Sequence, residues 1–157
     1  RKSPVSDVKQ FTVPFGSKEI SEILPHRWPF LLVDRIIELV AKHIVGLKAV
    51  TATEWFFPGH FPGEPVMPGV LQVEAMAQCG AVHTLIKPEY RGRMVVLAGV
   101  DDARFRRIVR PGDLLRIEVE ELSMRRTMGR SSARILIDGQ VASETVLTFM
   151  VVTDKLR

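Results

Sequence analysis

The segment from Pro68 to Ile86 restricts the possible folds more than any other part of the chain. It is predicted to be one helix, because a proline opens it, where the missing N–H does no harm, and Lys87 and Pro88 close it. We expect this helix to be buried on all sides, with the rest of the chain wrapped around it, since a helix that is apolar all round has no face for water. Its apolar side chains are Val70, Leu71, Val73, Ala75, Met76, Ala77, Ala81, Val82, Leu85 and Ile86.

Strands that can wrap the helix are predicted before and after it in the sequence. The segments that have the residue types or the two-residue period of strands are residues 30–40, 44–53, 95–100, 115–119, 133–137 and 140–152. Asp138–Gly139 is a strong signal for a two-residue hairpin, and a short helix capped by Ser17 is expected over residues 17–24. About five or six strands and one long helix predict an α+β fold, with an antiparallel sheet curled around the helix.

Length and composition indicate one ordinary globular domain. The 157 residues are 46% hydrophobic and 25% charged, values typical of soluble proteins. We assign residues 17–157 to a single domain and residues 1–16, which are polar and contain Pro4 and Pro14, to a loose N-terminal arm. No apolar run of membrane-spanning length occurs. The single cysteine, Cys79, rules out a disulfide framework or a cysteine-based zinc site and fits a reducing compartment.

A loop rich in proline and glycine, from Pro58 to Gly69, leads into the helix and carries His60. A stiff loop is the support that a general base needs if it is to be aimed at a substrate proton. The alternative, a histidine that only satisfies a turn, is equally compatible with the local sequence. His43 and His83 are expected to have packed or surface roles, and the role of His26 is left open.

Glu74 lies on the second turn of the helix, between apolar neighbours. Burial there disfavours its charged form, so we expect its pKa to rise and its carboxyl to act as a general acid. The alternative is a structural glutamate paired with an arginine or with Gln78, one turn later. Gly69 sits where the first helical N–H groups are unpaired and can stabilise an enolate-like oxygen, unless it merely starts the helix. A base, an acid and N–H donors suit proton abstraction beside a carbonyl, and His60 and Glu74 can meet across a subunit boundary.

A cluster of arginines follows the predicted strand over residues 95–100. Its members are Arg104, Arg106, Arg107 and Arg110. They predict either a docking patch for an acidic protein or phosphate, or a merely solvated basic surface. Nucleic acid is not expected as a partner, because few aromatic residues are interleaved and no nucleic-acid motif occurs. The sequence also lacks metal-ligand spacing, a glycine-rich phosphate loop and the GxSxG motif. A metal site, a nucleotide-binding site and a serine hydrolase are therefore not expected.

Three segments closely resemble the FabZ type of β-hydroxyacyl-acyl carrier protein dehydratase of dissociated fatty-acid synthesis. They are LPHRWPFLLVDR (24–35), FFPGHFPGEPVMPGVLQVEAMAQ (56–78) and LAGVDDARFRRIVRPGD (97–113). The resemblance covers residues 17–152 and implies a hot-dog fold, a sheet wrapped around a central helix. It also implies homodimers, often assembled as a trimer of dimers, with the site at the dimer interface.

The resemblance also implies a role for each site residue. His60 is the base that removes the C2 proton, and Glu74 of the other subunit is the acid that helps the C3 hydroxyl to leave as water. The Gly69 N–H holds the thioester carbonyl. The substrate is a (3R)-hydroxyacyl chain on the phosphopantetheine of acyl carrier protein, the product is a trans-2-enoyl thioester, and no metal or diffusible cofactor is required. The arginine cluster, Arg104 to Arg110, becomes a candidate for docking the carrier protein.

Some residues bear on finer distinctions within the resemblance. The related dehydratase that also isomerises the double bond has Asp where this chain has Glu74, which favours simple dehydration here. Trp28 and Cys79 replace residues more common in the family, away from the inferred chemistry. An acyl-thioester hydrolase on the same fold and a non-catalytic acyl-binding module are the competing functions. The expected compartment is the bacterial cytoplasm, or the plastid stroma if a transit peptide has been removed.

Overall fold

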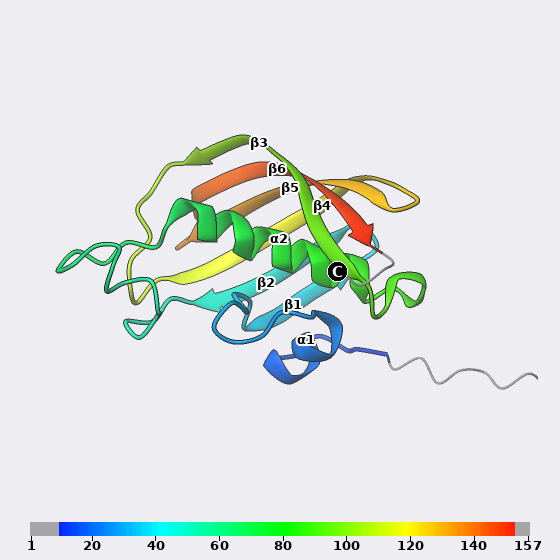
Figure 1. Ribbon diagram of the computed structural model, residues 1–157, viewed down its shortest axis with the longest axis horizontal. Helices are drawn as coiled ribbons and strands as arrows, with labels where there is room; N and C mark the ends of the chain where they lie inside the picture. The colour runs from blue at the N-terminus through cyan, green and yellow to red at the C-terminus, as the bar shows by residue number, and fades with distance from the viewer. Residues whose placement is uncertain (1–9, 153–157) are drawn as a thin grey trace, which may run out of the picture.

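A six-stranded antiparallel sheet curves around one long helix, α2 (Gly69–Leu85), in the computed structural model, which describes residues 10–152 (Figure 1). The strand order is β1-β2-β4-β5-β6-β3. The shorter helical elements are α1 (Ser17–Ile23) and the 3-10 turn η1 (Pro88–Tyr90), and within residues 10–152 no helix is long and apolar enough to cross a membrane. The predicted α+β architecture is confirmed. The strands are β1 (Arg35–Val40), β2 (His43–Ala49), β3 (Met94–Phe105), β4 (Leu114–Arg125), β5 (Met128–Ile137) and β6 (Gln140–Val152).

The predicted wrapping of α2 is confirmed on most of its surface, but burial on all sides is wrong for one stripe. Val70 is 75% exposed, and Glu74 and Ala77 are half-buried. These positions share one helix face by their spacing. At Glu74 and Ala77, β3 lies across a cavity from this face instead of packing against it, so this part of the face stays open. The fully buried residues of the core include Ala75, Met76, Cys79, Val82, Leu85, Ile36, Ile44, Leu115, Ile117 and Ile135.

The hairpin between β5 and β6 turns at the predicted residues. Asp138 and Gly139 both have positive φ, 50° and 77°, as a two-residue turn that matches the strand twist requires. The hairpin between β4 and β5 has no such signal, since Arg126 takes the positive φ there, at 55°.

Two strands are shorter than the sequence suggests. The strand expected over residues 30–40 begins only at Arg35, and the one expected over residues 44–53 ends at Ala49. Among the described residues, 30–34 bond to a strand only through Asp34, whose N–H donates to the Leu47 carbonyl at 2.8 Å and whose carboxylate accepts from the Ala49 N–H at 2.7 Å. Ser17 is the first residue of α1 and not its cap. The cap is Gly16, whose N–H donates to the Glu19 carboxylate at 3.2 Å.

The expected loose arm lies partly outside the described residues, which begin at residue 10. Its last part is not loose. Phe15 is buried and pairs with Ile36 of β1 through N–H to carbonyl bonds of 3.1 and 2.9 Å. The packed part of the chain therefore reaches back at least to Phe15.

β3 forms an exposed edge of the sheet. It pairs with β6 on one side and with no strand of residues 10–152 on the other (Figure 1). The apolar run over residues 95–100 does not bury fully, because Leu97 and Val100 are exposed, and Phe105 at the end of β3 is exposed as well. A long apolar edge strand is a surface that proteins usually cover.

Candidate active site

The loop between β2 and α2 places His60 on a rigid support. The His60 carbonyl accepts from the Val66 N–H at 3.0 Å, and His60 Nδ1 lies 2.7 Å from the Val66 carbonyl oxygen. A carbonyl oxygen only accepts, so Nδ1 carries the proton and Nε2 keeps its lone pair. The ring also stacks on Phe61, with centroids 4.0 Å apart. The histidine thus satisfies the turn through one nitrogen and presents the other as a base.

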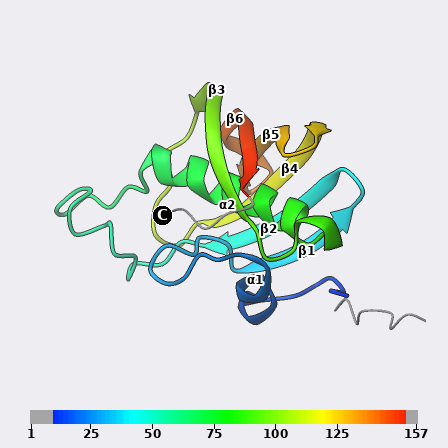
Figure 2. The ribbon, with the colours of Figure 1, turned by 45° about the vertical axis from the view of Figure 1, so that its right-hand side comes forward.

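Successive turns connect His60 to the sheet. The N–H groups of Glu54, Phe57 and His60 each donate, at 3.3 Å, to the carbonyl three residues earlier. The first of these residues is tied to β2, because the Glu54 carboxylate lies 2.9 Å from the Lys48 ammonium, with exposed side-chain fractions of 14% and 5%. Figure 2 shows this whole loop extending away from the sheet. His60 therefore lies on a loop that projects outward from the protomer and is anchored to β2 where it begins.

Gly69 opens α2 beside the ring of Phe105. Neither the Gly69 nor the Val70 N–H has an acceptor among residues 10–152, so both donors are available at the helix start. A Cβ built on Gly69 would lie 2.8 Å from the Phe105 ring. The space that a side chain would need is therefore filled by an aromatic ring. Glycine is required here for the close approach of β3.

Glu74 is held by Gln78, one of the two partner types expected from the sequence. Gln78 Nε2 donates to Glu74 Oε1 at 3.0 Å and to the Phe30 carbonyl at 2.7 Å, while its Oε1 accepts from the Leu32 N–H at 2.8 Å. One amide thus orients the carboxyl and anchors the segment before β1. The Glu74 side chain remains 21% exposed, so its expected burial is incomplete.

A cavity of about 240 Å³ opens beside Glu74. It lies between α2 and the strands, and it can hold an aliphatic chain with the carboxyl at its polar end. His60 does not line it, and within residues 10–152 no hydrogen bond or ion pair joins His60 to Glu74. One protomer does not bring the two groups together. The cavity is lined by His26, Glu74, Ala77, Gln78, Gly80, Ala81, Val95, Val96, Leu97, Val119, Ser131, Leu147 and Phe149.

His26 is a site residue whose role the sequence leaves open. Its Nε2 lies 3.7 Å from Glu74 Oε1, and the imidazole lines the same cavity. Burial lowers the pKa of His26, Glu74 opposes this effect, and Arg27 adds to it. The only sequence signal is its place in the segment 24–35 that carries the family resemblance.

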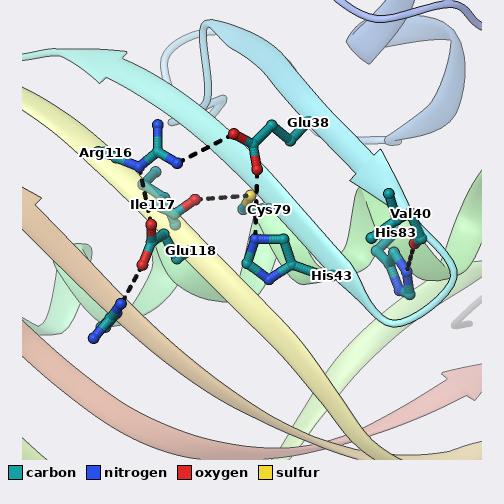
Figure 3. Close-up of polar contacts among 9 residues, drawn as sticks. Glu38, Val40, His43, Cys79, His83, Arg116, Ile117 and Glu118 are labelled. Carbon is teal, nitrogen blue, oxygen red and sulfur yellow. Dashed lines mark hydrogen bonds and ion pairs between the residues drawn. The ribbon is translucent and has the colours of Figure 1, made fainter.

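The remaining histidines and the cysteine lie outside the site, as expected (Figure 3). His83 is buried, with Nε2 3.0 Å from the Val40 carbonyl, and His43 lies 3.7 Å from Glu38 on the outer face of the sheet. Complete burial raises the pKa of the Cys79 thiol to about 12, so it is a packed side chain with no thiolate character at neutral pH.

Two members of the arginine cluster line a groove at the start of α2. Arg106 and Arg107 line this groove of about 470 Å³ together with Gly69 and Phe105. Arg106 pairs with Glu144 and Arg110 with Glu64, on exposed surface. The cluster therefore lies next to the free N–H groups of the helix start, with part of its charge already balanced.

Comparisons with known proteins agree with this geometry. Over 133 residues the chain is 60% identical to a 3-hydroxyacyl-acyl-carrier-protein dehydratase FabZ of Desulforamulus reducens, an alignment that covers 84% of this chain and 94% of that protein. It is 55% identical to the protein of the same name from Bacillus cereus, over 84% of this chain and 92% of that protein.

The fold has solved counterparts as well. A chain of the dehydratase heterocomplex ApeI:P from Xenorhabdus doucetiae superposes with a TM-score of 0.76 at 21% identity, over 86% of this chain and 91% of that one. The hot-dog fold implied by the resemblance is confirmed. The FabA-like domain family matches residues 24–146. The chain therefore belongs to the FabA-like family and, within it, to the FabZ-type dehydratases.

Proposed function

We propose that this chain is a (3R)-hydroxyacyl-acyl carrier protein dehydratase, which eliminates water from 3-hydroxyacyl thioesters to give trans-2-enoyl thioesters in fatty-acid elongation. The observation that carries the proposal is the tautomer of His60, whose Nδ1–H is committed to Val66 so that Nε2 is a base. The relatives that bear this activity in their names support it.

The reaction is an elimination with three contributions from the chain. His60 Nε2 takes the C2 proton, and the electron pair moves onto the thioester carbonyl, whose developing charge the Gly69 N–H stabilises. The C2–C3 double bond then forms as the C3–oxygen bond breaks, and Glu74 gives its proton to the departing hydroxyl, which leaves as water. A positioned acid or base contributes roughly 10²- to 10⁴-fold and an oxyanion donor about 10²- to 10³-fold.

We place the acid and the base of one site on two subunits. His60 and Glu74 do not meet within residues 10–152, the loop that carries His60 projects outward, and β3 offers a free apolar edge. A homodimer through this edge would cover the exposed strand and the open stripe of α2. A trimer of dimers is the larger assembly we propose. Light scattering at working concentrations checks both, and an active monomer would contradict the shared site.

Acyl carrier protein is the proposed partner. Arg106 and Arg107 of the cluster Arg104, Arg106, Arg107 and Arg110 line the groove at Gly69, where a thioester on a phosphopantetheine arm would enter. Charge reversal at Arg106 and Arg107 is expected to raise KM for carrier-linked substrates and to leave small thioesters unaffected. Arg134→Glu, on the outer face of the sheet, is the matched control. Equal effects on both substrate classes would contradict docking here.

His60→Ala and Glu74→Gln test the assigned roles. Each variant should abolish enoyl formation, followed by its ultraviolet absorbance, with unchanged unfolding curves. Full activity in either variant would refute the role of that residue. Release of free thiol without an enoyl product would decide for a thioester hydrolase, and binding without turnover for an acyl-binding module.

The proposed chemistry needs only an acid, a base and N–H donors from the chain, so no cofactor is expected. Activity should survive dialysis against a chelator. We propose the cytoplasm as the compartment, by analogy with the relatives, and the plastid stroma as the alternative. Fractionation of the source cells distinguishes them.

A further inference from the structure

His26 is brought to Glu74 from a remote part of the chain and is held there firmly. Arg27 Nη1 donates to the carbonyls of Leu24 and His26, at 2.8 and 2.7 Å, and so fixes the backbone on both sides of the imidazole. Gln78 fastens the same segment to α2 through Phe30 and Leu32 while it donates to Glu74. One amide therefore sets the position of the carboxyl and of the loop that carries the imidazole.

The surroundings of the two His26 nitrogens decide its tautomer. Nδ1 is buried and has no hydrogen-bond partner among residues 10–152, whereas Nε2 faces the Glu74 carboxyl at 3.7 Å. A buried N–H without an acceptor is rarer in folded proteins than a buried lone pair without a donor. A lone pair aimed at a carboxylate would also be repelled. The neutral imidazole therefore carries its proton on Nε2.

We propose that His26 is a positioning residue of this site, whose Nε2–H donates to Glu74 Oε1 when the carboxyl has released its proton. The proposal rests on the proposed function. The present separation exceeds a hydrogen bond, and such contacts commonly tighten only in the substrate complex. Gln78 donates to the same oxygen, so the acidic proton belongs on Oε2, and the two donors together stabilise the carboxylate that remains after proton transfer.

The charged groups around this pair are few. Among residues 10–152, Glu74 is the only charged side chain besides His26 that lines the cavity, and Arg27 is the other charge that acts on His26. Removing His26 therefore removes one donor to the carboxylate and leaves the other, Gln78. The carboxylate left after proton transfer is then less well stabilised, so Glu74 should deliver its proton more slowly.

The test compares His26→Leu, which removes the donor, with His26→Gln, which can supply an Nε2–H again. With His26→Leu we expect kcat to fall roughly 10- to 100-fold, the range of a hydrogen bond to a charged group, with KM changed less than about twofold. One limb of the bell-shaped pH profile of kcat/KM should move to higher pH while the other stays. His26→Gln should restore most of both properties.

His43→Leu is the matched control, because His43 lies at the same 3.7 Å from a glutamate, Glu38, but outside the cavity. It should leave kcat and the pH profile unchanged. An unmoved profile in His26→Leu, or no gain in His26→Gln over it, would overturn the proposal.

A second readout does not depend on the reaction. The carbon-13 shift of the Glu74 carboxylate, measured at one alkaline pH without substrate, should differ between His26→Leu and the unsubstituted protein and should return toward the unsubstituted value in His26→Gln. An unchanged shift in His26→Leu refutes the inference. If the unsubstituted protein forms no enoyl product while this shift changes, the proposed function fails and the pairing of His26 with Glu74 stands.

Discussion

Replacing Lys48 by methionine should destabilise the protein by about 3 kcal/mol. The ammonium and the Glu54 carboxylate are 2.9 Å apart, with only 5% and 14% of their side chains exposed. Methionine keeps much of the buried stem and removes the charge, which leaves the carboxylate nearly dry and unpaired. Breaking a buried pair costs about 3–5 kcal/mol, and the residual exposure of Glu54 favours the lower end.

Urea unfolding at fixed protein concentration measures this loss, because an oligomer's stability depends on concentration. Glu54→Gln in the Lys48→Met background should recover most of the loss, since no unpaired charge then remains. Lys87→Met is the control, because the pair between Lys87 and Glu121 is longer, at 3.4 Å, and more exposed at the lysine, so its loss should be about 1 kcal/mol or less. The reasoning is refuted if the effects of Lys48→Met and Glu54→Gln on the free energy of unfolding are strictly additive, or if Lys48→Met alone costs less than about 1 kcal/mol.

If His60 is the base, as proposed, the pair between Lys48 and Glu54 also supports catalysis, since Glu54 lies in the series of turns that ends at His60. Lys48→Met should therefore lower kcat more than it raises KM. An unchanged kcat would mean that the base is positioned by its bonds to Val66 alone.

Two further perturbations follow from close packing and burial. Gly69→Ala should destabilise the fold by about 1–3 kcal/mol and lower kcat/KM, because the new Cβ meets the Phe105 ring at 2.8 Å. Adding Phe105→Ala to the same chain should relieve the strain. If Gly69→Ala alone is as stable as the unsubstituted protein, the contact is contradicted. The Cys79 thiol, whose pKa burial raises from 9.0 to about 12, contributes stability that is complete below about pH 9 and is lost as pH rises toward 12, by about 1.4 kcal/mol per pH unit. In Cys79→Ala, the free energy of unfolding measured with urea should fall less steeply with pH between about pH 9 and 12 than in the unsubstituted protein. Equal pH dependence in the two proteins would contradict this.

The elements predicted well from the sequence are those whose signal is local. Helix α2 and the Asp138–Gly139 turn are determined by residues that are neighbours in the chain, so the local sequence pattern is enough to predict both. Residues 30–33 look like a strand because they are apolar, yet the Gln78 amide binds Phe30 and Leu32 from across the fold and holds this segment as a loop. No periodicity can reveal such a contact.

The same limit applies to the site. His60, Gly69 and Glu74 lie on one continuous motif, and their surroundings can be anticipated from it. His26 is remote in sequence, and only the packing of its loop on α2 places its imidazole beside the carboxyl. The incomplete burial of Glu74 also depends on a distant element, because β3 stands off from that helix face.

The absence of any contact between His60 and Glu74 within residues 10–152 has a genetic consequence if each site is shared as proposed. Two alleles that are each inactive, one lacking the base and one lacking the acid, would complement each other in the same cell. Random pairing of the two products would leave about a quarter of all sites with both groups intact. Whether a cell has the activity would then depend on the combination of its two alleles and not on either allele alone.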